Sequence, residues 1–136
     1  MKVLALDHGA ARTGVAVSDP TGTLVRPLPV IRKVDSPAGA AALDEVIAAE
    51  APERIVVGDP KGLDGRAGGQ ARVARRFAER LRARAAVPVD LHDERLTTAE
   101  AERRRRESGS RADADSLAAC VLLEAYLASA GRVPAR

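Results

Sequence analysis

Apolar residues in this 136-residue chain occur in short runs that alternate with longer segments of helical periodicity. The run at residues 3–6 predicts a buried strand, and the alternation at 13–18 predicts a second strand antiparallel to it. A third strand within 24–31 is interrupted by Pro27 and Pro29, which predicts either an edge strand or an irregular stretch. The chain therefore begins with three short strands joined by turns.

Strands and helices alternate after this point. In order, we expect a helix capped by Ser36 and running to about Glu50, a strand at 54–58, a helix at 70–85, a strand at 87–91, a helix opening at Thr97 and a final helix at 112–129. Val73, Phe77 and Leu81 form the expected apolar stripe of the second helix. This order predicts a mixed α/β sheet, antiparallel at its start and parallel afterwards, in a single domain spanning 1–136.

Composition narrows the choice of partners. Phe77 and Tyr126 are the only aromatic residues, which argues against recognition of single strands by base stacking. The net charge is +3, and three lysines among 22 basic residues leave arginine to supply the rest. Arginine suits bidentate phosphate contacts. These features permit a nucleic-acid partner but do not require one.

Cysteine usage and the absence of long apolar runs point to the cytoplasm. Cys120 is the single cysteine, so no intramolecular disulfide can form, and it lies in an apolar helical segment that we expect to be core. The first residues predict a strand rather than a secretory leader, and no apolar run approaches the roughly 18 residues of a membrane span. We expect a cytoplasmic protein without a membrane partner.

Three carboxylates stand where predicted strands end or helices begin. Asp7 follows the first strand, Glu94 follows the strand at 87–91, and Asp115 opens the last helical pattern. Buried strand ends make carboxylates costly unless a cation compensates them, and three that converge could hold a divalent metal. Each has an ordinary alternative: a hairpin turn for Asp7, a favourable charge near a helix start for Glu94, and an N-cap for Asp115 or Asp113.

The helical wheel favours Asp115 over Asp113. Asp115 shares a face with Ala118, Ala119 and Leu122, and that apolar face should pack on the sheet. Asp113 falls well away from this face, so we expect it to face solvent or to cap the helix.

Six stretches of the chain together resemble one known family. They are Leu6-Asp7-His8-Gly9 with residues 12–18, residues 55–60, Leu63-Asp64-Gly65, residues 77–81, Asp93-Glu94-Arg95-Leu96-Thr97-Thr98, and Asp115-Ser116-Leu117-Ala118-Ala119 with residues 122–126. The chain resembles the YqgF/RuvX family of RNase H-like nucleases, described as Holliday junction resolvases and as pre-ribosomal-RNA nucleases. The resemblance covers nearly the whole chain, and it implies an RNase H-like fold with catalytic, metal-binding acids at Asp7, Glu94 and Asp115.

The leading hypothesis is a metal-dependent endonuclease that uses Mg²⁺ or Mn²⁺, with two ions bound by all-oxygen ligands. The resemblance favours processing of the 5′ end of pre-16S ribosomal RNA and an association with ribosome precursors. Resolution of Holliday junctions in branched DNA is the second candidate, and a non-catalytic nucleic-acid-binding or transcription-associated module is the third. The sequence leaves open whether the protein is a monomer or a homodimer.

Arginines supply the candidate substrate contacts. Arg12 and Arg95 adjoin the predicted acids, while Arg72, Arg76 and Arg80 lie on the second predicted helix. For any single arginine a solvated face is the alternative, but as a set they offer a surface for phosphates, with salt-dependent binding.

Two residues depart from the family pattern close to the predicted site. His8 and Asp59 stand where apolar or aromatic residues are usual, and the stretch between Gly109 and Asp115 is short. We expect His8 and Asp59 to be solvated or hydrogen-bonded rather than metal-bound. The short stretch raises the question of how strongly substrate is held there.

Overall fold

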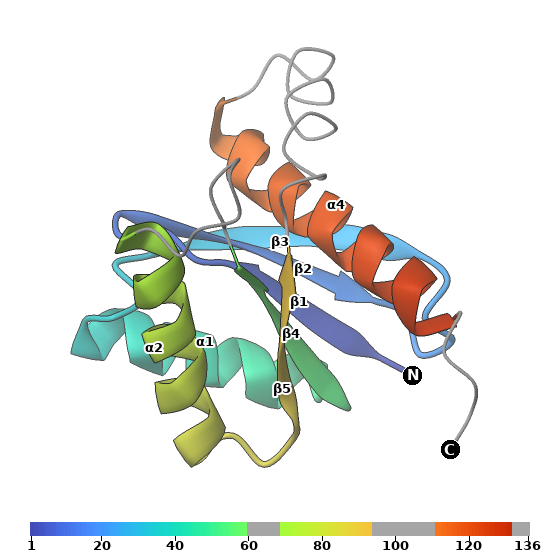
Figure 1. The fold of residues 1–136 in the computed structure, drawn as a ribbon, viewed down its shortest axis with the longest axis horizontal. Helices are drawn as coiled ribbons and strands as arrows, with labels where there is room; N and C mark the ends of the chain where they lie inside the picture. The colour runs from blue at the N-terminus through green and yellow to red at the C-terminus, as the bar shows by residue number, and fades with distance from the viewer. Residues whose placement is uncertain (60–68, 94–110, 132–136) are drawn as a thin grey trace.

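Five strands form one sheet in the order β3-β2-β1-β4-β5 (Figure 1). The computed structural model describes residues 1–59, 69–93 and 111–131, without the side chains of 70, 71, 111–115 and 130–131. The strands are β1 (Val3–Asp7), β2 (Arg12–Ser18), β3 (Val25–Arg32), β4 (Arg54–Asp59) and β5 (Val89–Asp93). The β1–β2 and β2–β3 pairs are antiparallel, whereas β1–β4 and β4–β5 are parallel. The predicted mixed sheet is confirmed.

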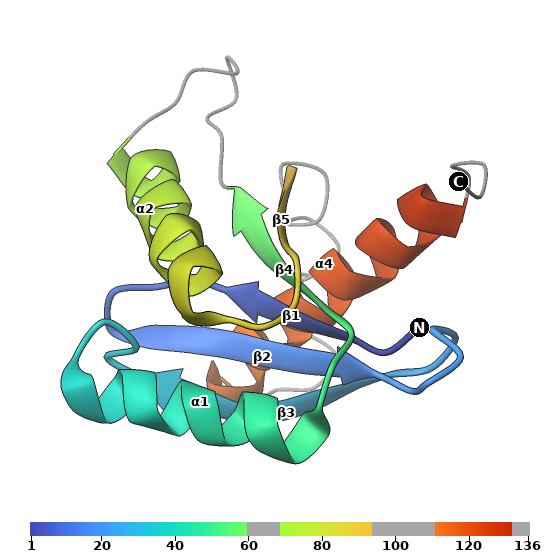
Figure 2. The same ribbon diagram turned by 90° about the horizontal axis from the view of Figure 1, so that it is seen from below.

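Helices cover both faces of this sheet. Helices α1 (Pro37–Glu50) and α2 (Gly69–Arg84) pack on one face, and α4 (Arg111–Gly131) packs on the other, as Figure 2 shows for α1 and α4. The first core layer joins Leu43 of α1 and Phe77 of α2 to the strands. The second joins Ala119 and Leu122 of α4 to them.

Side chains of β1 alternate between the two faces of the sheet, and this alternation sets the face on which Asp7 projects. Leu4 and Leu6 are fully buried in the layer beneath α1 and α2, while Val3 and Ala5 are fully buried beneath α4. A strand covered on both faces reads as a continuous apolar run, as this one does. Because successive side chains alternate, Asp7 continues the series of Val3 and Ala5 and projects on the α4 face.

The start of α1 is fixed by local chemistry that the sequence predicts. The Ser36 hydroxyl accepts a hydrogen bond from the Gly39 N–H at 3.1 Å, and Pro37 occupies the first turn, where its missing N–H costs nothing. A Cβ on Gly39 would lie 2.0 Å from the Lys33 carbonyl oxygen, so only glycine fits this close approach. The cap holds Asp35 at the end of the β3–α1 connection.

The strand β3 is an edge strand, as its prolines predict. Pro27 pairs opposite Ala16 of β2, and Pro29 follows two residues later on the same strand. Proline is tolerated in a sheet where its N–H position faces away from the partner strand. The segment is both an edge strand and irregular, because the β2–β3 register shifts between Thr13 and Val15.

Several element boundaries differ from the predictions by one or two residues, and two of these differences bear on the candidate site. The strand β5 begins at Val89 rather than residue 87, because its pairing with β4 starts at Ile55 and Val89. Helix α4 begins at Arg111, so neither Asp113 nor Asp115 is its N-cap. The helix predicted to open at Thr97 lies outside the described residues. Among the described helices, none has the length and apolarity that a membrane crossing requires.

Candidate active site

Three adjacent parallel strands each end in an aspartate. Asp7 closes β1, Asp59 closes β4 and Asp93 closes β5. The carboxyl ends of parallel strands meet at one edge of the sheet, which is where α/β proteins place their ligands. Helices α2 and α4 also begin toward this edge, in the upper left part of Figure 1. The position of Asp7 at a strand end was predicted from the sequence, whereas the pattern shared with Asp59 and Asp93 follows from the strand bounds in the structure.

One row across the sheet contains Asp7 and three other residues. The register pairs Asp7 with Gly14 of β2, and the pairings of Leu6 with Val57 and of Gly58 with His92 extend the row through β4 to β5. Its order is Gly14, Asp7, Gly58, His92. Both glycines are buried and have no side chain, so no side chain from β2 or β4 stands beside the Asp7 carboxylate on this face.

Helix α4 brings Asp115 toward the same face of the sheet. The hydroxyl of Ser116 is buried and donates a hydrogen bond to the Leu28 carbonyl oxygen of β3 at 2.7 Å, which anchors the first part of the helix. Ala119 and Leu122 are buried against the sheet, which confirms the predicted packing face. The backbone of Asp115 directly precedes Ser116 in this anchored segment, and its side chain lies outside the described residues.

The other predicted site residues divide between the described and undescribed parts of the chain. Glu94 and Arg95 lie outside the described residues and follow the last residue of β5 directly. Within the described residues, no group of three or more His, Cys, Asp or Glu side chains is placed to hold a metal ion. Two of the three predicted ligand side chains are thus not placed, so the metal site remains a prediction.

The turn after Asp7 is held in place by contacts of His8 on the α2 face of the sheet. The His8 ring is buried, packs on Phe77 with centroids 4.6 Å apart, and bonds through Nε2 to Asp35 Oδ2 at 2.8 Å. A Cβ on Gly9 would lie 2.3 Å from the Arg12 carbonyl oxygen, so this tight turn requires glycine. The expectation that His8 is hydrogen-bonded is confirmed.

Asp35 is shared between His8 and Arg80. Its Oδ1 accepts a hydrogen bond from Arg80 Nη2 at 2.6 Å. Partial burial acts to raise the pKa of Asp35, but the hydrogen bonds and positive charges of His8 and Arg80 outweigh it and hold the pKa below its ordinary value. Arg80 is therefore engaged within the protein, which weakens its candidacy as a substrate contact.

The other described arginines of the predicted set are exposed, as Arg80 itself is. Arg72 and Arg76 are exposed on α2, and Arg12 is exposed at the start of β2, where it pairs in register with Arg32. This arrangement leaves several guanidinium groups near the carboxyl edge of the sheet, where anionic ligands would meet them.

Asp59 is a buried carboxylate held by one cation. The residue is 5% exposed, and its Oδ2 accepts hydrogen bonds from Arg75 Nη2 at 3.1 Å and Nε at 3.4 Å. Its Oδ1 is buried and has no hydrogen-bond partner within the part of the chain that the structure describes. Asp59 therefore projects on the α2 face, away from Asp7, and its expected hydrogen-bonded role is confirmed.

A second polar network supports β5 on the α4 face. Asp90 Oδ2 accepts hydrogen bonds from Tyr126 Oη at 2.6 Å and from Arg54 Nη1 at 2.6 Å. Partial burial acts to raise the pKa of Asp90, but these two partners outweigh it and lower the pKa. Burial and the bond to Asp90 raise the pKa of Tyr126 to about 12. The His92 ring meets the Tyr126 ring edge-on, with centroids 5.8 Å apart.

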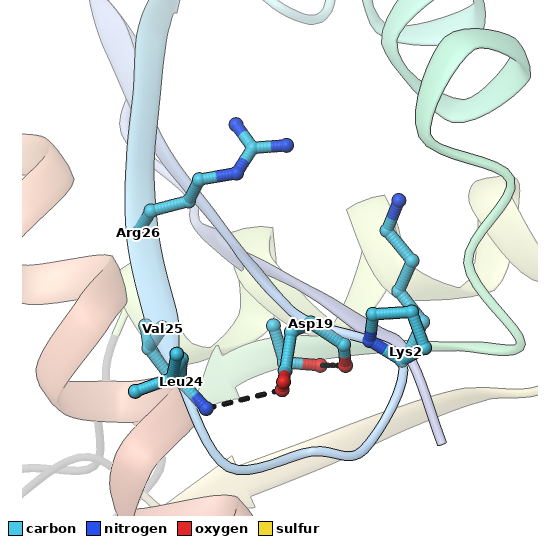
Figure 3. Close-up of a pocket in the computed structure, with 7 residues that line it drawn as sticks. Lys2, Asp19, Leu24, Val25 and Arg26 are labelled. Carbon is cyan, nitrogen blue, oxygen red and sulfur yellow. Dashed lines mark hydrogen bonds between the residues drawn. The ribbon is translucent and has the colours of Figure 1, made fainter.

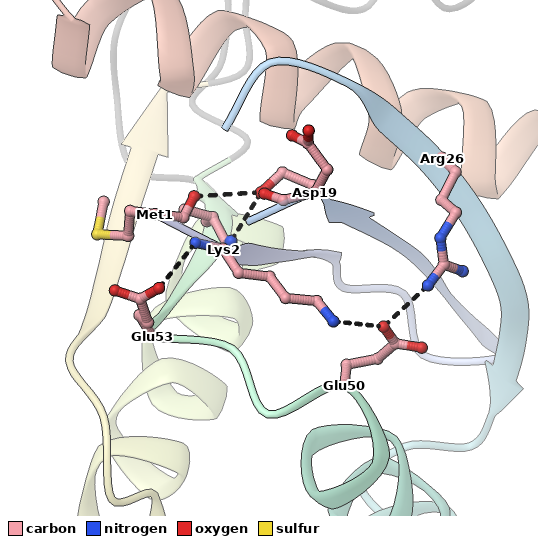
Figure 4. Close-up of polar contacts among 8 residues, drawn as sticks. Met1, Lys2, Asp19, Arg26, Glu50 and Glu53 are labelled. Atoms are coloured by element: carbon pink, nitrogen blue, oxygen red, sulfur yellow. Dashed lines mark hydrogen bonds and ion pairs between the residues drawn. The ribbon is translucent and has the colours of Figure 1, made fainter. Parts of the chain in front are cut away.

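A cavity of about 380 Å³ lies at the opposite, amino end of the parallel strands. Its lining includes Lys2, Asp19, Leu24 and Arg26 (Figure 3). Lys2 and Arg26 are both engaged by Glu50 Oε1, at 3.1 and 2.9 Å (Figure 4). Asp19 accepts backbone hydrogen bonds within its own turn, which lower its pKa together with the Thr21 hydroxyl. Because these charges already compensate one another, we place the candidate site at the carboxyl edge instead.

Known proteins are similar to this chain in sequence. The family model for RuvX, described as Holliday junction resolvase, matches residues 1–129. A protein of Anaeromyxobacter sp. (strain Fw109-5) named "Putative pre-16S rRNA nuclease" is 42% identical over 132 residues, which cover 93% of this chain and 96% of the relative. A protein of the same name from Moorella thermoacetica is 38% identical over 141 residues, covering 97% and 98%.

Solved structures with low sequence identity share the fold. RuvC of T. thermophilus in complex with a Holliday junction substrate matches with a TM-score of 0.56 and 21% identity, covering 96% of this chain and 97% of that one. The fowlpox virus Holliday junction resolvase matches with a TM-score of 0.60 and 10% identity, covering 96% and 99%. These matches confirm the predicted RNase H-like fold. By its sequence, this chain belongs to the RuvX family of nucleases and resolvases, which act on phosphodiester bonds.

Proposed function

We propose that this protein is a metal-dependent endonuclease that processes the 5′ end of pre-16S ribosomal RNA, with Asp7, Glu94 and Asp115 as its catalytic acids. The observation that supports this most directly is the position of Asp7. It ends a central strand on the α4 face and has glycine on both neighbouring strands in its row. A carboxylate in this setting leaves space for a cation and a phosphate to approach the backbone.

The chemistry of the proposed ligand set fits Mg²⁺ or Mn²⁺. Three carboxylates provide the oxygen donors that these ions prefer, and Asp7 is held in place by the locked turn through His8. Asp7, Glu94 and Asp115 would hold the ions, which when bound supply a nucleophilic hydroxide and charge stabilisation at the phosphate. No side chain is then needed to activate the water.

The protein residues would position the substrate. The guanidinium groups of Arg72 and Arg76 are exposed on α2 near the same edge and can contact phosphates of a bound strand. Arg12 and Arg95 adjoin the proposed acids in sequence and would contact phosphates closer to the cleavage position. Such contacts orient the strand, while the acids determine which phosphodiester is cleaved.

The names of the relatives favour ribosomal RNA as substrate, which would place the activity in the cytoplasm beside ribosome precursors. A Holliday junction is the second candidate, since the family description and two solved structures of the same fold name this substrate. The two substrates differ in sugar and in branching, so one set of purified variants can be assayed on both.

The test is cleavage by wild-type protein and the Asp7→Asn variant. A labelled RNA spanning the 5′ boundary of 16S rRNA and an immobile four-way DNA junction would each be incubated with Mg²⁺, Mn²⁺ or no divalent ion. We expect metal-dependent RNA cleavage by the wild type and none by Asp7→Asn. The variant should melt at an equal or higher temperature without metal, because the proposed acids repel one another when no cation compensates them and the variant removes one of the charges.

A matched control is Asp44→Asn, which removes an exposed carboxylate that pairs with Arg84 on the surface. It should cleave like the wild type. Near-wild-type activity of Asp7→Asn would refute the site, and cleavage of the junction alone would select the second substrate. Metal-dependent binding without any cleavage would favour a non-catalytic module.

A further inference from the structure

His92 shares a sheet row with Asp7, and its ring is on the same face. The register places Gly58 between them, so the two Cα atoms are separated by two strand spacings, about 9–10 Å. The ring contact with Tyr126 of α4 fixes the side of the sheet on which His92 projects. Because Gly58 has no side chain, nothing on β4 separates the imidazole from the Asp7 carboxylate.

The imidazole is held in place by a chain of contacts that, among the described residues, does not use its nitrogens. Tyr126 meets it edge-on, the Tyr126 hydroxyl is held by Asp90, and Asp90 is held by Arg54. In the part of the chain that the structure describes, neither ring nitrogen of His92 has a hydrogen-bond partner. His92 as a whole is partly exposed.

We propose that His92 is a substrate-contacting residue that donates a hydrogen bond to a phosphate oxygen of the nucleic-acid strand bound beside Asp7. The proposal rests on the nuclease function proposed above. A neutral imidazole carries one N–H donor in either tautomer, so the contact requires no change of protonation. The His92 donor and the Asp7 carboxylate, on either side of Gly58, are spaced to hold one phosphate between the acidic centre and the edge of the sheet.

A phosphate contact explains the arrangement better than a packing role. A histidine that served only to pack against Tyr126 would gain nothing from its two nitrogens, and an apolar ring would fill the same space. The support from Arg54 through Asp90 also fixes the ring without using its polar atoms. A pre-oriented donor loses little conformational entropy when it binds its ligand.

The experiment compares His92→Phe with His92→Gln and Tyr126→Phe. Phenylalanine keeps a ring against Tyr126 but removes both nitrogens, glutamine keeps an N–H donor, and Tyr126→Phe removes the hydroxyl while keeping the ring that supports His92. The affinity for the fluorescein-labelled RNA spanning the 5′ boundary of 16S rRNA is measured by anisotropy in Ca²⁺. Loss of one hydrogen bond to a charged group predicts affinity about 10- to 100-fold weaker for His92→Phe. His92→Gln should recover part of this loss, and Tyr126→Phe should bind like the wild type.

Methylphosphonate substitution identifies the contacted phosphate. Each phosphate of the RNA is replaced in turn, and each RNA is tested against wild type and His92→Phe. One position should weaken wild-type binding yet leave the binding of His92→Phe nearly unchanged, as expected when both changes remove the same contact. Strictly additive effects at every position would overturn the proposal.

Two further measurements separate the alternatives. If His92→Phe loses Mn²⁺ affinity in the absence of RNA, His92 is a metal ligand and the proposal is wrong. If wild-type protein cleaves RNA in Mg²⁺ while His92→Phe binds and cleaves equally well, the proposal fails and the nuclease function stands. If the wild type binds RNA but does not cleave it, the nuclease function fails, while the methylphosphonate comparison still decides whether His92 contacts a phosphate.

Discussion

Removal of Arg75 should destabilise the protein, whereas replacement of its partner Asp59 by leucine should not. Asp59 is 5% exposed and receives both hydrogen bonds of Arg75 on one carboxylate oxygen, while the other oxygen is buried without a partner. A carboxylate in this position depends on its single cation. The Arg75 side chain is 40% exposed and can be solvated if the carboxylate is removed.

The magnitude follows from two opposing terms. Opposite charges 3.1 Å apart attract by about 5 kcal/mol at an effective dielectric constant near 20. The cost of removing the Asp59 carboxylate from water is also several kcal/mol, so the pair contributes little net stability. Asp59→Leu should therefore change the free energy of unfolding by less than about 1 kcal/mol.

Arg75→Gln removes only the attraction and leaves the desolvated carboxylate. Breaking a fully buried pair in this way costs roughly 3–5 kcal/mol, and partial exposure of Arg75 reduces the expected cost to about 1–3 kcal/mol. At roughly 3–4 °C per kcal/mol for a chain of this size, the melting temperature should fall by about 3–12 °C.

The assay is thermal and urea unfolding of wild type, both single variants and the double variant at neutral pH. The double variant should resemble Asp59→Leu alone, because no buried charge remains for Arg75 to compensate. Arg84→Gln is the matched control, since Arg84 lies on the same helix and pairs with the exposed Asp44 at 3.2 Å. It should cost less than about 0.5 kcal/mol. The reasoning is refuted if Arg75→Gln is as harmless as this control or if Asp59→Leu costs more than about 2 kcal/mol.

Three more outcomes are expected. Asp115→Ala should abolish cleavage at saturating Mg²⁺, while Asp113→Ala should spare it and cost at most about 1 kcal/mol as a lost charge near the start of α4; an inactive Asp113 variant would mean that the wrong acid was chosen. Joint replacement of Arg72 and Arg76 by glutamine should weaken RNA binding and reduce the slope of log affinity against log salt by about 1–2, whereas an unchanged slope would indicate a solvated face. Asp35 has a lowered pKa, so its stabilising effect is complete above its ordinary value of 3.8 and is lost as the pH falls through the lowered value. Urea unfolding near neutral pH and near pH 2.5 should therefore show a smaller acid loss for Asp35→Asn than for wild type, and equal losses would contradict the assigned ion pairs.

The central strands were predictable because a strand buried on both faces has an unbroken run of apolar residues in the sequence. Residues 3–6 and 55–58 are continuous apolar runs, and both lie in central strands covered on two faces. The stripe expected on α2 was wrong at Val73, which is 43% exposed, while Ala74 and Ala78 are buried with Phe77. Residues spaced four apart on a helix rotate away from one face by about 40° at each step. The buried face of α2 therefore follows alternating spacings of three and four residues, which bring in Ala74 and Ala78.

The candidate site was predictable only where it follows directly from a strand end. Asp7 and the anchored position of Asp115 could be expected from the apolar patterns around them. The bond of His8 to Asp35 joins residues 27 positions apart, and no local periodicity encodes such a pair. The row that joins Asp7 to His92 depends on the register of two parallel pairings, which side-chain patterns do not specify.

The two prolines of β3 have a consequence for the behaviour of this protein at high concentration. An open sheet edge is a template on which a partly unfolded neighbour can add a strand. Pro27 and Pro29 each remove a backbone N–H donor from this edge strand, and the β2–β3 register shifts next to Pro29, between Thr13 and Val15. An incoming strand would therefore meet an irregular edge that lacks two donors, which opposes the formation of a regular ladder. The chain thus protects this edge against amyloid-like growth through the backbone itself, a protection that salt cannot screen.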